Sequence, residues 1–338
     1  METSKLFLLS SSLLLLLLAT RPCPLSERCN PKDKKFSFKS KSPRQSLHSS
    51  FVESQTDCCE WYCVECDLTT HRINSLTIFS GELSGQIPDA VGDLPFLETL
   101  IFRKLSNLTG QIPPAIAKLK HLKRVRLSWT NLSGPVPAFF SELKNLTYLD
   151  LSFNNLSGPI PGSLSLLPNL GALHLDRNDL TGPIPDSFGK FAGSTPDLYL
   201  SHNQLSGKIP YSFRGFDPTV MDLSRNKLEG DLSIFFNANK STQIVDFSRN
   251  LFQFDLSRVE FPQSLTSLDL SHNKIAGSLP EMMTSLDLQF LNVSYNRLCG
   301  KIPVGGKLQS FDYDSYFHNR CLCGAPPRAA SDGSACRI

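Results

Sequence analysis

Acidic side chains recur along this chain at a spacing that could bring carboxylates together on one surface. Asp150 and Asp176 come from neighbouring repeats of the sequence, and further aspartates follow in later repeats. Two carboxylates at a suitable separation could act as the acid and the base of a glycosidase. Neighbouring strands, however, would supply these acids as a flat row, with no pocket that raises one pKa and lowers the other. We therefore expect a binding surface and not a catalytic site.

Other combinations of reactive residues also fail to indicate an enzyme. Ser, His and Asp occur together in segments such as Asp269-Leu270-Ser271-His272, but these triples are products of a repeated frame. The sequence contains no Gly-rich phosphate loop and no H-E-x-x-H pair. We predict that the protein is not an enzyme and needs no cofactor.

The first 26 residues predict export from the cell. Lys5 precedes an apolar run from Leu6 to Ala19 that is too short to span a bilayer comfortably, and small and polar residues follow up to Ser26. This order is typical of a secretory signal peptide. No later run of about 18 apolar residues occurs. We expect a soluble extracellular protein with no transmembrane span.

The ten cysteines gather near the two ends of the chain. Cys63-x-x-Cys66 has metal-like spacing, but no His pair completes a zinc finger pattern. In an oxidising compartment disulfides are more common than zinc sites. We predict no metal site. Because Cys23 would leave with the signal peptide, an odd number remains, and Cys63 is the candidate for the one left over.

The charge balance excludes two classes of protein. The chain has 34 Lys and Arg against 31 Asp and Glu, a formal net charge of +3, and 40% of its residues are hydrophobic. This is not the strongly basic footprint of a nucleic-acid binder, and it is too apolar for a disordered chain. Overall charge would steer partners only weakly, so local patches must select them.

A leucine frame with a period of 23 to 25 residues must position the polar side chains. One clear copy is Leu146-x-x-Leu149-x-Leu151-x-x-Asn154-x-Leu156-x-Gly158-x-Ile160-Pro161. Each copy predicts a short strand at Leu-x-Leu, a turn, and an irregular or 3-10 return. No copy can bury its leucines alone, so the core must come from stacking. Ten copies are centred on Leu83, Leu108, Leu132, Leu156, Leu180, Leu205, Leu228, Phe252, Ile275 and Leu298.

The predicted fold class is an α/β repeat, a right-handed leucine-rich repeat solenoid with a parallel concave β-sheet. We expect a signal peptide at 1–26, an atypical N-terminal Cys-rich cap at 27–72, ten repeats at 73–303 and a C-terminal Cys-rich cap at 304–338. The inward asparagines should satisfy backbone groups of neighbouring coils, which makes them structural. They are Asn154, Asn178, Asn203, Asn226, Asn250, Asn273 and Asn296.

The repeat form and its flanks resemble the plant polygalacturonase-inhibiting proteins. The resemblance rests on Asp57-Cys58-Cys59-Glu60-Trp61-Tyr62-Cys63-Val64, on the segment from Asp197 to Gly207, and on Cys321-Leu322-Cys323-Gly324-Ala325-Pro326. It implies a secreted, monomeric cell-wall glycoprotein that inhibits fungal endo-polygalacturonases in plant defence. It also implies disulfides that join Cys29 to Cys58, Cys59 to Cys66, Cys299 to Cys321, and Cys323 to Cys336.

The concave face is the expected docking surface, because side chains between the strand leucines point away from the core. We call the position between the two core residues of each strand the middle slot. It holds Thr77, Ile101, Arg126, Asp150, His174, Tyr199, Asp222, Asp246, Asp269 and Asn292. The resemblance implies enzyme contacts at Asp150, Asp176, Asp222 and Gln243, to which we add Tyr199 and Arg225. A mixed-charge groove with aromatic anchors suits a protein partner.

Two surface features suggest further roles. A basic run could hold the polyanion pectin, through Lys118, Lys120, Lys123, Arg124 and Arg126. Glycosylation is expected at the sequons of Asn107, Asn131, Asn145, Asn155 and Asn239. A sixth sequon at Asn292 faces the groove, and we expect it to be empty.

One segment departs from the family pattern. The stretch from Phe36 to Gln55 is rich in Ser and Lys and contains Pro43, where the family has an amphipathic cap helix. Loss of that cap would leave the first coil poorly covered. The alternatives to inhibition are an ice-binding solenoid, which needs a flat repetitive row of Asn or Thr, and a recognition module for peptide or pectin ligands.

Overall fold

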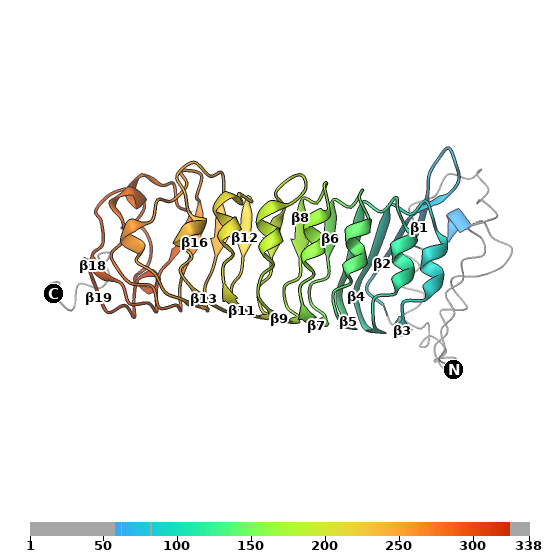
Figure 1. Ribbon diagram of the computed structural model, residues 1–338, viewed down its shortest axis with the longest axis horizontal. Helices are drawn as coiled ribbons and strands as arrows, with labels where there is room; N and C mark the ends of the chain where they lie inside the picture. The colour runs from blue at the N-terminus through green and yellow to red at the C-terminus, as the bar shows by residue number, and fades with distance from the viewer. Residues whose placement is uncertain (1–57, 62, 82, 325–338) are drawn as a thin grey trace, which may run out of the picture.

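The computed structural model describes residues 58–61, 63–81 and 83–324. The predicted signal peptide, the Phe36 to Gln55 segment and the tail after Gly324 lie outside these residues. Each described copy of the leucine frame forms one coil, and the coils stack into an elongated rod (Figure 1). The chain therefore forms the leucine-rich repeat solenoid that the sequence predicts.

The first strand of each coil joins one parallel sheet, which we call the concave sheet. Hydrogen bonds link each strand to the strand of the next coil, and β1 (Val64–Cys66) adds antiparallel to the first strand. The parallel strands are β2 (Ile73–Phe79), β4 (Thr99–Gly110), β5 (Arg124–Gly134), β6 (Tyr148–Asp150), β8 (Ala172–His174), β10 (Asp197–Tyr199), β12 (Val220–Asp222), β14 (Ile244–Asp246), β16 (Ser267–Asp269) and β17 (Phe290–Asn292).

A second parallel sheet, which the leucine frame did not lead us to predict, runs beside the first. The long strands β4 and β5 pass through both sheets. The second sheet forms at the Leu-Ser-Gly part of the frame, where exposed and buried residues alternate. That alternation is the signal that could have indicated it. Its other strands are β3 (Gly85–Gln86), β7 (Asn155–Pro159), β9 (Asp179–Gly182), β11 (Gln204–Lys208), β13 (Lys227–Gly230) and β15 (Leu251–Phe252).

Short 3-10 helices return the chain on the side away from the concave sheet, and within the described residues every helix is of this type. Most follow the proline of the frame, whose ring fixes its φ near −70° and which is itself in an extended conformation. These returns are η3 (Asp89–Asp93), η4 (Pro114–Lys118), η5 (Ala138–Glu142), η6 (Gly162–Leu166), η7 (Asp186–Lys190), η8 (Tyr211–Gly215), η9 (Ser233–Phe235), η10 (Leu256–Arg258) and η11 (Glu281–Ser285).

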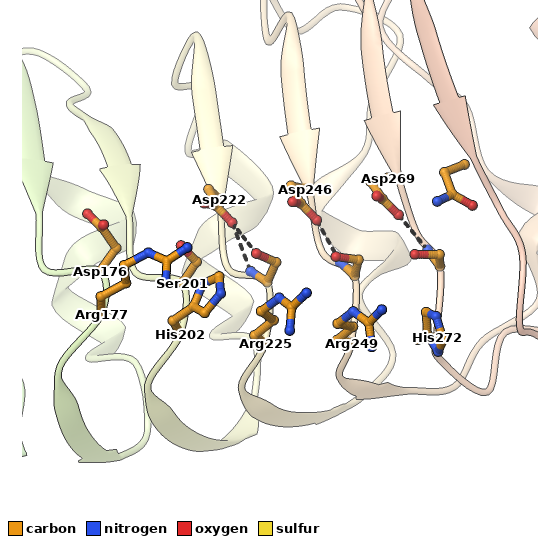
Figure 2. A pocket seen from close by; sticks show the side chains of 14 residues that line it. Asp176, Arg177, Ser201, His202, Asp222, Arg225, Asp246, Arg249, Asp269 and His272 are labelled. Carbon is orange, nitrogen blue, oxygen red and sulfur yellow. Dashed lines mark hydrogen bonds between the residues drawn. The ribbon is translucent and has the colours of Figure 1, made fainter. Parts of the chain in front are cut away.

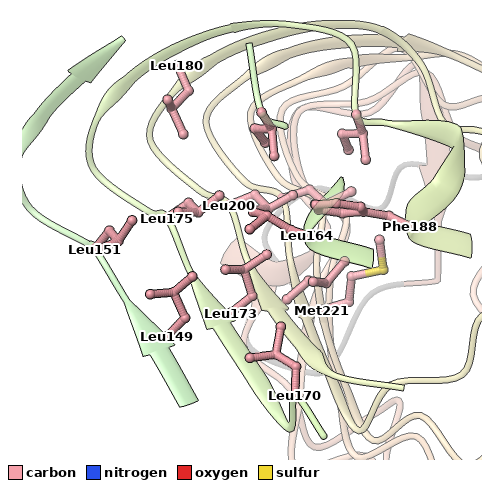
Figure 3. Close-up of a cluster of buried hydrophobic side chains, with 14 of the residues drawn as sticks. Leu149, Leu151, Leu164, Leu170, Leu173, Leu175, Leu180, Phe188, Leu200 and Met221 are labelled. Atoms are coloured by element: carbon pink, nitrogen blue, oxygen red, sulfur yellow. The ribbon is translucent and has the colours of Figure 1, made fainter. Parts of the chain in front are cut away.

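Leucines of successive coils fill the interior between these layers. Leu149 and Leu151 point inward from one coil and meet Leu173 and Leu175 of the next (Figure 3). All four are fully buried. Because each coil buries its leucines only against its neighbours, stability must come from stacking.

The inward asparagines connect neighbouring coils, as the sequence predicts. Asn203 donates through Nδ2 to the carbonyl of Leu175 in the preceding coil at 2.9 Å and to that of Leu200 at 3.1 Å. Its Oδ1 accepts from the backbone N–H of Leu180 at 3.0 Å. The same pattern recurs through Asn296 and continues to Asn319 in the last coil. These amides satisfy buried backbone groups that the irregular turns leave without partners.

Caps with disulfides close both ends of the stack. The predicted bonds from Cys59 to Cys66 and from Cys299 to Cys321 are present. Cys58 and Cys323 are also disulfide-bonded, but Cys29 and Cys336, the partners we predicted for them, lie outside the described residues. Cys63 retains its thiol. The N-terminal cap contains η2 (Cys58–Glu60), and the C-terminal cap contains η12 (Tyr313–Ser315) and β19 (Cys321–Cys323), which pairs with β18 (Cys299–Lys301) of the last repeat.

Gly193 marks a tight contact between coils and gives a first prediction. A Cβ on Gly193 would lie 1.8 Å from the carbonyl oxygen of Pro168, which is backbone and cannot move aside. We expect Gly193→Ala to lower the free energy of unfolding by about 1–3 kcal/mol, as measured by chemical denaturation. Gly215→Ala is the matched control, because a Cβ there meets nothing within 4 Å. Equal effects of the two substitutions would contradict the proposed clash.

Candidate functional site

The strand register places the predicted middle-slot residues in one continuous row across the concave sheet. Asp150 lies beside Arg126 and His174, and Asp222 lies between Tyr199 and Asp246. The same register extends from Thr77 at one end to Asn292 at the other. Residues far apart in sequence therefore form one surface, as the frame predicts.

A shallow groove of about 450 Å³ follows the C-terminal half of this row. Acidic side chains lie along its strands, and basic side chains lie just beyond the strand ends (Figure 2). The two kinds of charge thus form two parallel rows. The acidic row contains Asp222, Asp246 and Asp269, and the basic row contains Arg177, Arg225 and Arg249 (Figure 2). The groove is lined by Asp176, Arg177, Ser201, His202, Asp222, Ser224, Arg225, Asp246, Ser248, Arg249, Asp269, Ser271, His272 and Asn292.

Serines two residues further along the chain orient the carboxylates. Oδ1 of Asp222 accepts hydrogen bonds from the backbone N–H of Ser224 at 3.0 Å and from its hydroxyl at 2.7 Å. The backbone N–H groups of Ser248 and Ser271 bind Asp246 and Asp269 in the same way. The aspartates are therefore fixed before any partner arrives, which lowers the entropy cost of binding.

The residues just beyond the concave strands, among them the basic row, have an unusual backbone conformation that we did not predict from the sequence. The residue before each inward asparagine has φ between 52° and 55°, from Phe153 through Arg177, Arg225 and Arg249 to Tyr295, and Lys104 and Trp129 hold the same frame position with φ of 57° and 56°. Non-glycine residues rarely adopt this left-handed conformation. It recurs in coil after coil because the chain must turn there between the two sheets. The side chains of successive coils consequently form a regular row.

Aromatic side chains stack between neighbouring coils at several places on this face. The rings of His174 and Tyr199 are nearly parallel with centroids 4.0 Å apart. Trp129, which is 44% exposed, stacks on Phe153 at 3.7 Å, and the guanidinium of Arg177 lies 4.9 Å from the Phe153 ring. Rigid aromatic groups beside arginines are typical of the energetic centres of protein interfaces.

Two carboxyl groups of the groove titrate near pH 6. Burial raises the pKa of Asp246 to about 6, and the nearby carboxylates of Asp222 and Asp269 contribute to the rise. Burial also raises the pKa of Asp176 to about 6, with contributions from Asp150 and Asp222. The negative charge of the groove therefore decreases as the pH falls below 6.

Asp176 gives a second prediction, because it occupies a slot that holds serine in most coils. Its pKa is raised from 3.8 to about 6 in the folded protein, so the folded state binds more protons than the unfolded state between these values. The free energy of unfolding must fall as the pH rises through this window, by up to roughly 2–3 kcal/mol. We expect Asp176→Ser to raise the melting temperature at pH 7.5 and to have little effect at pH 4.

Thermal denaturation at the two pH values checks this expectation. Asp179→Ser is the control, because Asp179 is exposed on the second sheet. An equal gain from Asp176→Ser at pH 4 and pH 7.5 would mean that the buried charge is not the cause.

The structure changes the interpretation of Asp150, which we predicted as a direct contact. Asp150 is in the row, but it is only 1% exposed and its Oδ2 lies 2.7 Å from Nε of Arg126. The sequence could not show this burial, because it depends on the arginine of the preceding coil. The more accessible member of the pair is Arg126, whose side chain is 30% exposed.

The remaining predicted contacts are accessible from the concave side. Asp222 and Tyr199 are half-buried in the row, and Arg225 is exposed in the basic row. Gln243 is exposed immediately before β14, and its backbone pairs with Thr219 and Thr266 of the adjacent coils. Gln243 therefore lies at the edge of the row and not in the groove.

The predicted pectin patch is less basic in three dimensions than in sequence. Lys118, Lys120 and Lys123 each form an ion pair with a carboxylate of a neighbouring coil, at 4.0, 2.9 and 2.7 Å. Arg126 is paired with Asp150, whereas Arg124 is exposed. These carboxylates offset much of the local positive charge, and pectin binding by this patch stays a prediction.

The five sequon asparagines we selected for glycosylation all have exposed side chains. Asn292 instead is half-buried, and its Oδ1 accepts from the backbone and hydroxyl of Ser294. Accessibility therefore agrees with the selection, and occupancy stays a prediction.

The cysteine cluster at the N-terminal cap does not offer a metal site. Sulfur atoms of Cys58, Cys59 and Cys66 lie within 4.8 Å of one another, but Cys59 and Cys66 are joined in a disulfide. Bonded sulfurs are not thiolate ligands.

Among the described residues, no helix is long and apolar enough to cross a membrane.

Comparisons with known proteins agree with this architecture. Models of the family described as leucine rich repeat match residues 120–180, 197–216, 264–286 and 287–306. A polygalacturonase inhibitor from Vitis vinifera is 90% identical over 96% of this chain and 98% of its own length. One from Pyrus communis is 71% identical over 89% of this chain and 92% of its own length. The crystal structure of a plant ice-binding protein is 55% identical, with a TM-score of 0.85 over 90% of this chain and all of that chain.

Proposed function

This chain belongs to the leucine-rich repeat family of plant polygalacturonase inhibitors, and from that membership we propose that it binds and inhibits fungal endo-polygalacturonases through its concave sheet. The family consists of inhibitor proteins, so the chain is not an enzyme. We further propose that it acts as a secreted monomer in the plant cell wall, in defence against pathogens.

The observation that carries the proposal is the continuous row of oriented carboxylates beside the basic row. A surface of this kind complements a partner with basic side chains around a cleft. Inhibition then needs no chemistry from this chain. Inhibition follows if the docked solenoid covers the mouth of the substrate cleft, or if its aspartates form ion pairs with the basic residues of the enzyme that bind galacturonate.

The test is to add the purified mature protein to several endo-polygalacturonases and to measure the release of reducing ends. We expect inhibition of at least one enzyme that saturates with inhibitor concentration. A folded protein that leaves every enzyme fully active would overturn the proposal. Asp222→Lys and Gln243→Lys serve as binding-face variants in the same assay.

Ice binding is the second candidate, because one similar solved structure is an ice-binding protein. A flat, repetitive row of Asn or Thr would favour it, but the concave slots here vary and carry charge. Thermal hysteresis measured on the same preparation distinguishes the two functions. Hysteresis without inhibition of any polygalacturonase would favour ice binding.

A further inference from the structure

Arg126 and Asp150 form an ion pair at the start of the acidic part of the row. Oδ2 of Asp150 lies 2.7 Å from Nε of Arg126. Oδ1 of Asp150 accepts hydrogen bonds from the backbone N–H of Ser152 at 3.0 Å and from its hydroxyl at 2.6 Å. Both carboxylate oxygens are therefore used within the protein, and a partner cannot reach them without breaking these contacts.

The guanidinium group is held on one side and open on the other. Nε of Arg126 contacts Asp150 and also donates to the hydroxyl of Ser128 at 3.1 Å. Within the described part of the chain, its two Nη atoms have no hydrogen-bond partner. A guanidinium fixed through Nε presents its remaining N–H groups as a planar fork, which fits a carboxylate.

The surroundings of Arg126 fit an interface anchor. Arg124 is exposed on the same strand and lies beside Tyr148 in the sheet register. The Tyr148 ring is 5.3 Å from that of His174, which in turn stacks on Tyr199. An oriented arginine next to a rigid aromatic cluster is the composition that contributes most to binding at protein interfaces.

We propose that Arg126 binds the carboxylate of an acidic side chain on the docked polygalacturonase, and that Asp150 is a positioning residue that acts through Arg126. This inference rests on the proposed function. It gives the concave sheet two kinds of contact, a guanidinium donor at Arg126 and carboxylate acceptors from Asp222 onward. The partner could then dock in only one orientation along the solenoid.

A double-mutant cycle on the full mature chain tests the proposal, with the dissociation constant for an inhibited polygalacturonase as the readout. We expect Arg126→Gln to weaken binding by about 10- to 50-fold and Asp150→Asn by about 5- to 20-fold. The double variant should bind no more than about two-fold more weakly than Arg126→Gln alone. If the two effects instead multiply, Asp150 contributes independently and the proposal is wrong.

Further variants test the sign and geometry of the contact. In the Asp150→Asn background, Arg126→Glu should bind about 5- to 10-fold more weakly than Arg126→Gln, because two carboxylates would then meet. Tighter binding would mean that the partner group is basic, which overturns the proposal. Arg126→Lys should not restore wild-type affinity, because an ammonium lacks the planar fork. Full affinity in Arg126→Lys would contradict the role of that fork.

Controls separate the possible failures. Arg297→Gln, at an exposed site outside the concave sheet, should leave affinity unchanged, and thermal denaturation shows whether each variant is folded. If Asp150→Asn does not fold, Ser152→Ala removes one hydrogen bond to Asp150 and replaces it in the cycle. Ser152→Ala alone should weaken binding two- to five-fold, and this loss of affinity should disappear in the Arg126→Gln background. A wild-type protein that binds no polygalacturonase rejects the proposed function itself, and this inference with it.

Discussion

Asp222→Lys is expected to weaken binding to an inhibited polygalacturonase by about 100-fold or more. Asp222 lies at the centre of the acidic row, between Tyr199 and Asp246 in the sheet register. Ser224 holds its Oδ1, while Oδ2 has no hydrogen bond within the described residues. A lysine there would face the basic groups of the partner. Loss of one member of a charge pair at an interface costs roughly 2–5 kcal/mol.

Glu229→Lys is the matched control for this prediction. It makes the same change in net charge, but Glu229 is exposed on β13 of the second sheet. We expect the control to keep nearly full inhibition when inhibition constants are measured from reducing-end release at a fixed ionic strength. Equal losses for the two variants would indicate that overall charge, and not the concave sheet, governs binding.

The second large effect concerns stability, and the expected result is that Asn203→Ala lowers the free energy of unfolding by about 3 kcal/mol. The amide of Asn203 contacts three carbonyls and one backbone N–H of its own and the preceding coil. Alanine would leave these buried groups without partners, and each unsatisfied group costs about 1–3 kcal/mol before relaxation. Urea denaturation followed by circular dichroism measures the change.

Asn169→Ala provides the comparison, because Asn169 is exposed and makes a single side-chain hydrogen bond, to the carbonyl of Lys144. We expect a change below about 0.5 kcal/mol for this surface substitution. If Asn203→Ala were equally mild, the inward asparagines would not be what joins the coils. The inhibition constant of folded Asn203→Ala should stay close to that of the wild type, because the side chain does not reach the concave surface.

The contrast between Asp222→Lys, which should affect binding, and Asn203→Ala, which should affect stability, reflects how the molecule is organised. Buried asparagines and leucines maintain the stacking of coils, and the stacking aligns the surface carboxylates. The surface residues can therefore differ from coil to coil without loss of the fold. Partner selection can vary on such a scaffold while the core frame stays the same.

The sequence alone determined the coil register, the residues of the middle slot and the structural role of the inward asparagines, whereas the disulfides from Cys59 to Cys66 and from Cys299 to Cys321 were implied by the family resemblance. The physical reason is that a strand, a turn and a buried leucine recur at a nearly constant period, so each position of the frame meets the same environment in every coil. Any residue could thus be placed on a face by counting from the nearest leucine.

Only the tertiary structure decided which side chains of the row a partner can reach. Asp150 is covered because Arg126 of the previous coil pairs with it, and Lys120 and Lys123 are neutralised by glutamates of adjacent coils. These contacts join residues 22 to 25 positions apart, and they depend on side-chain identity and length in two coils at once. A repeating frame specifies the position of a side chain but not its partner, and so the open face of Arg126 emerges only when the coils are stacked.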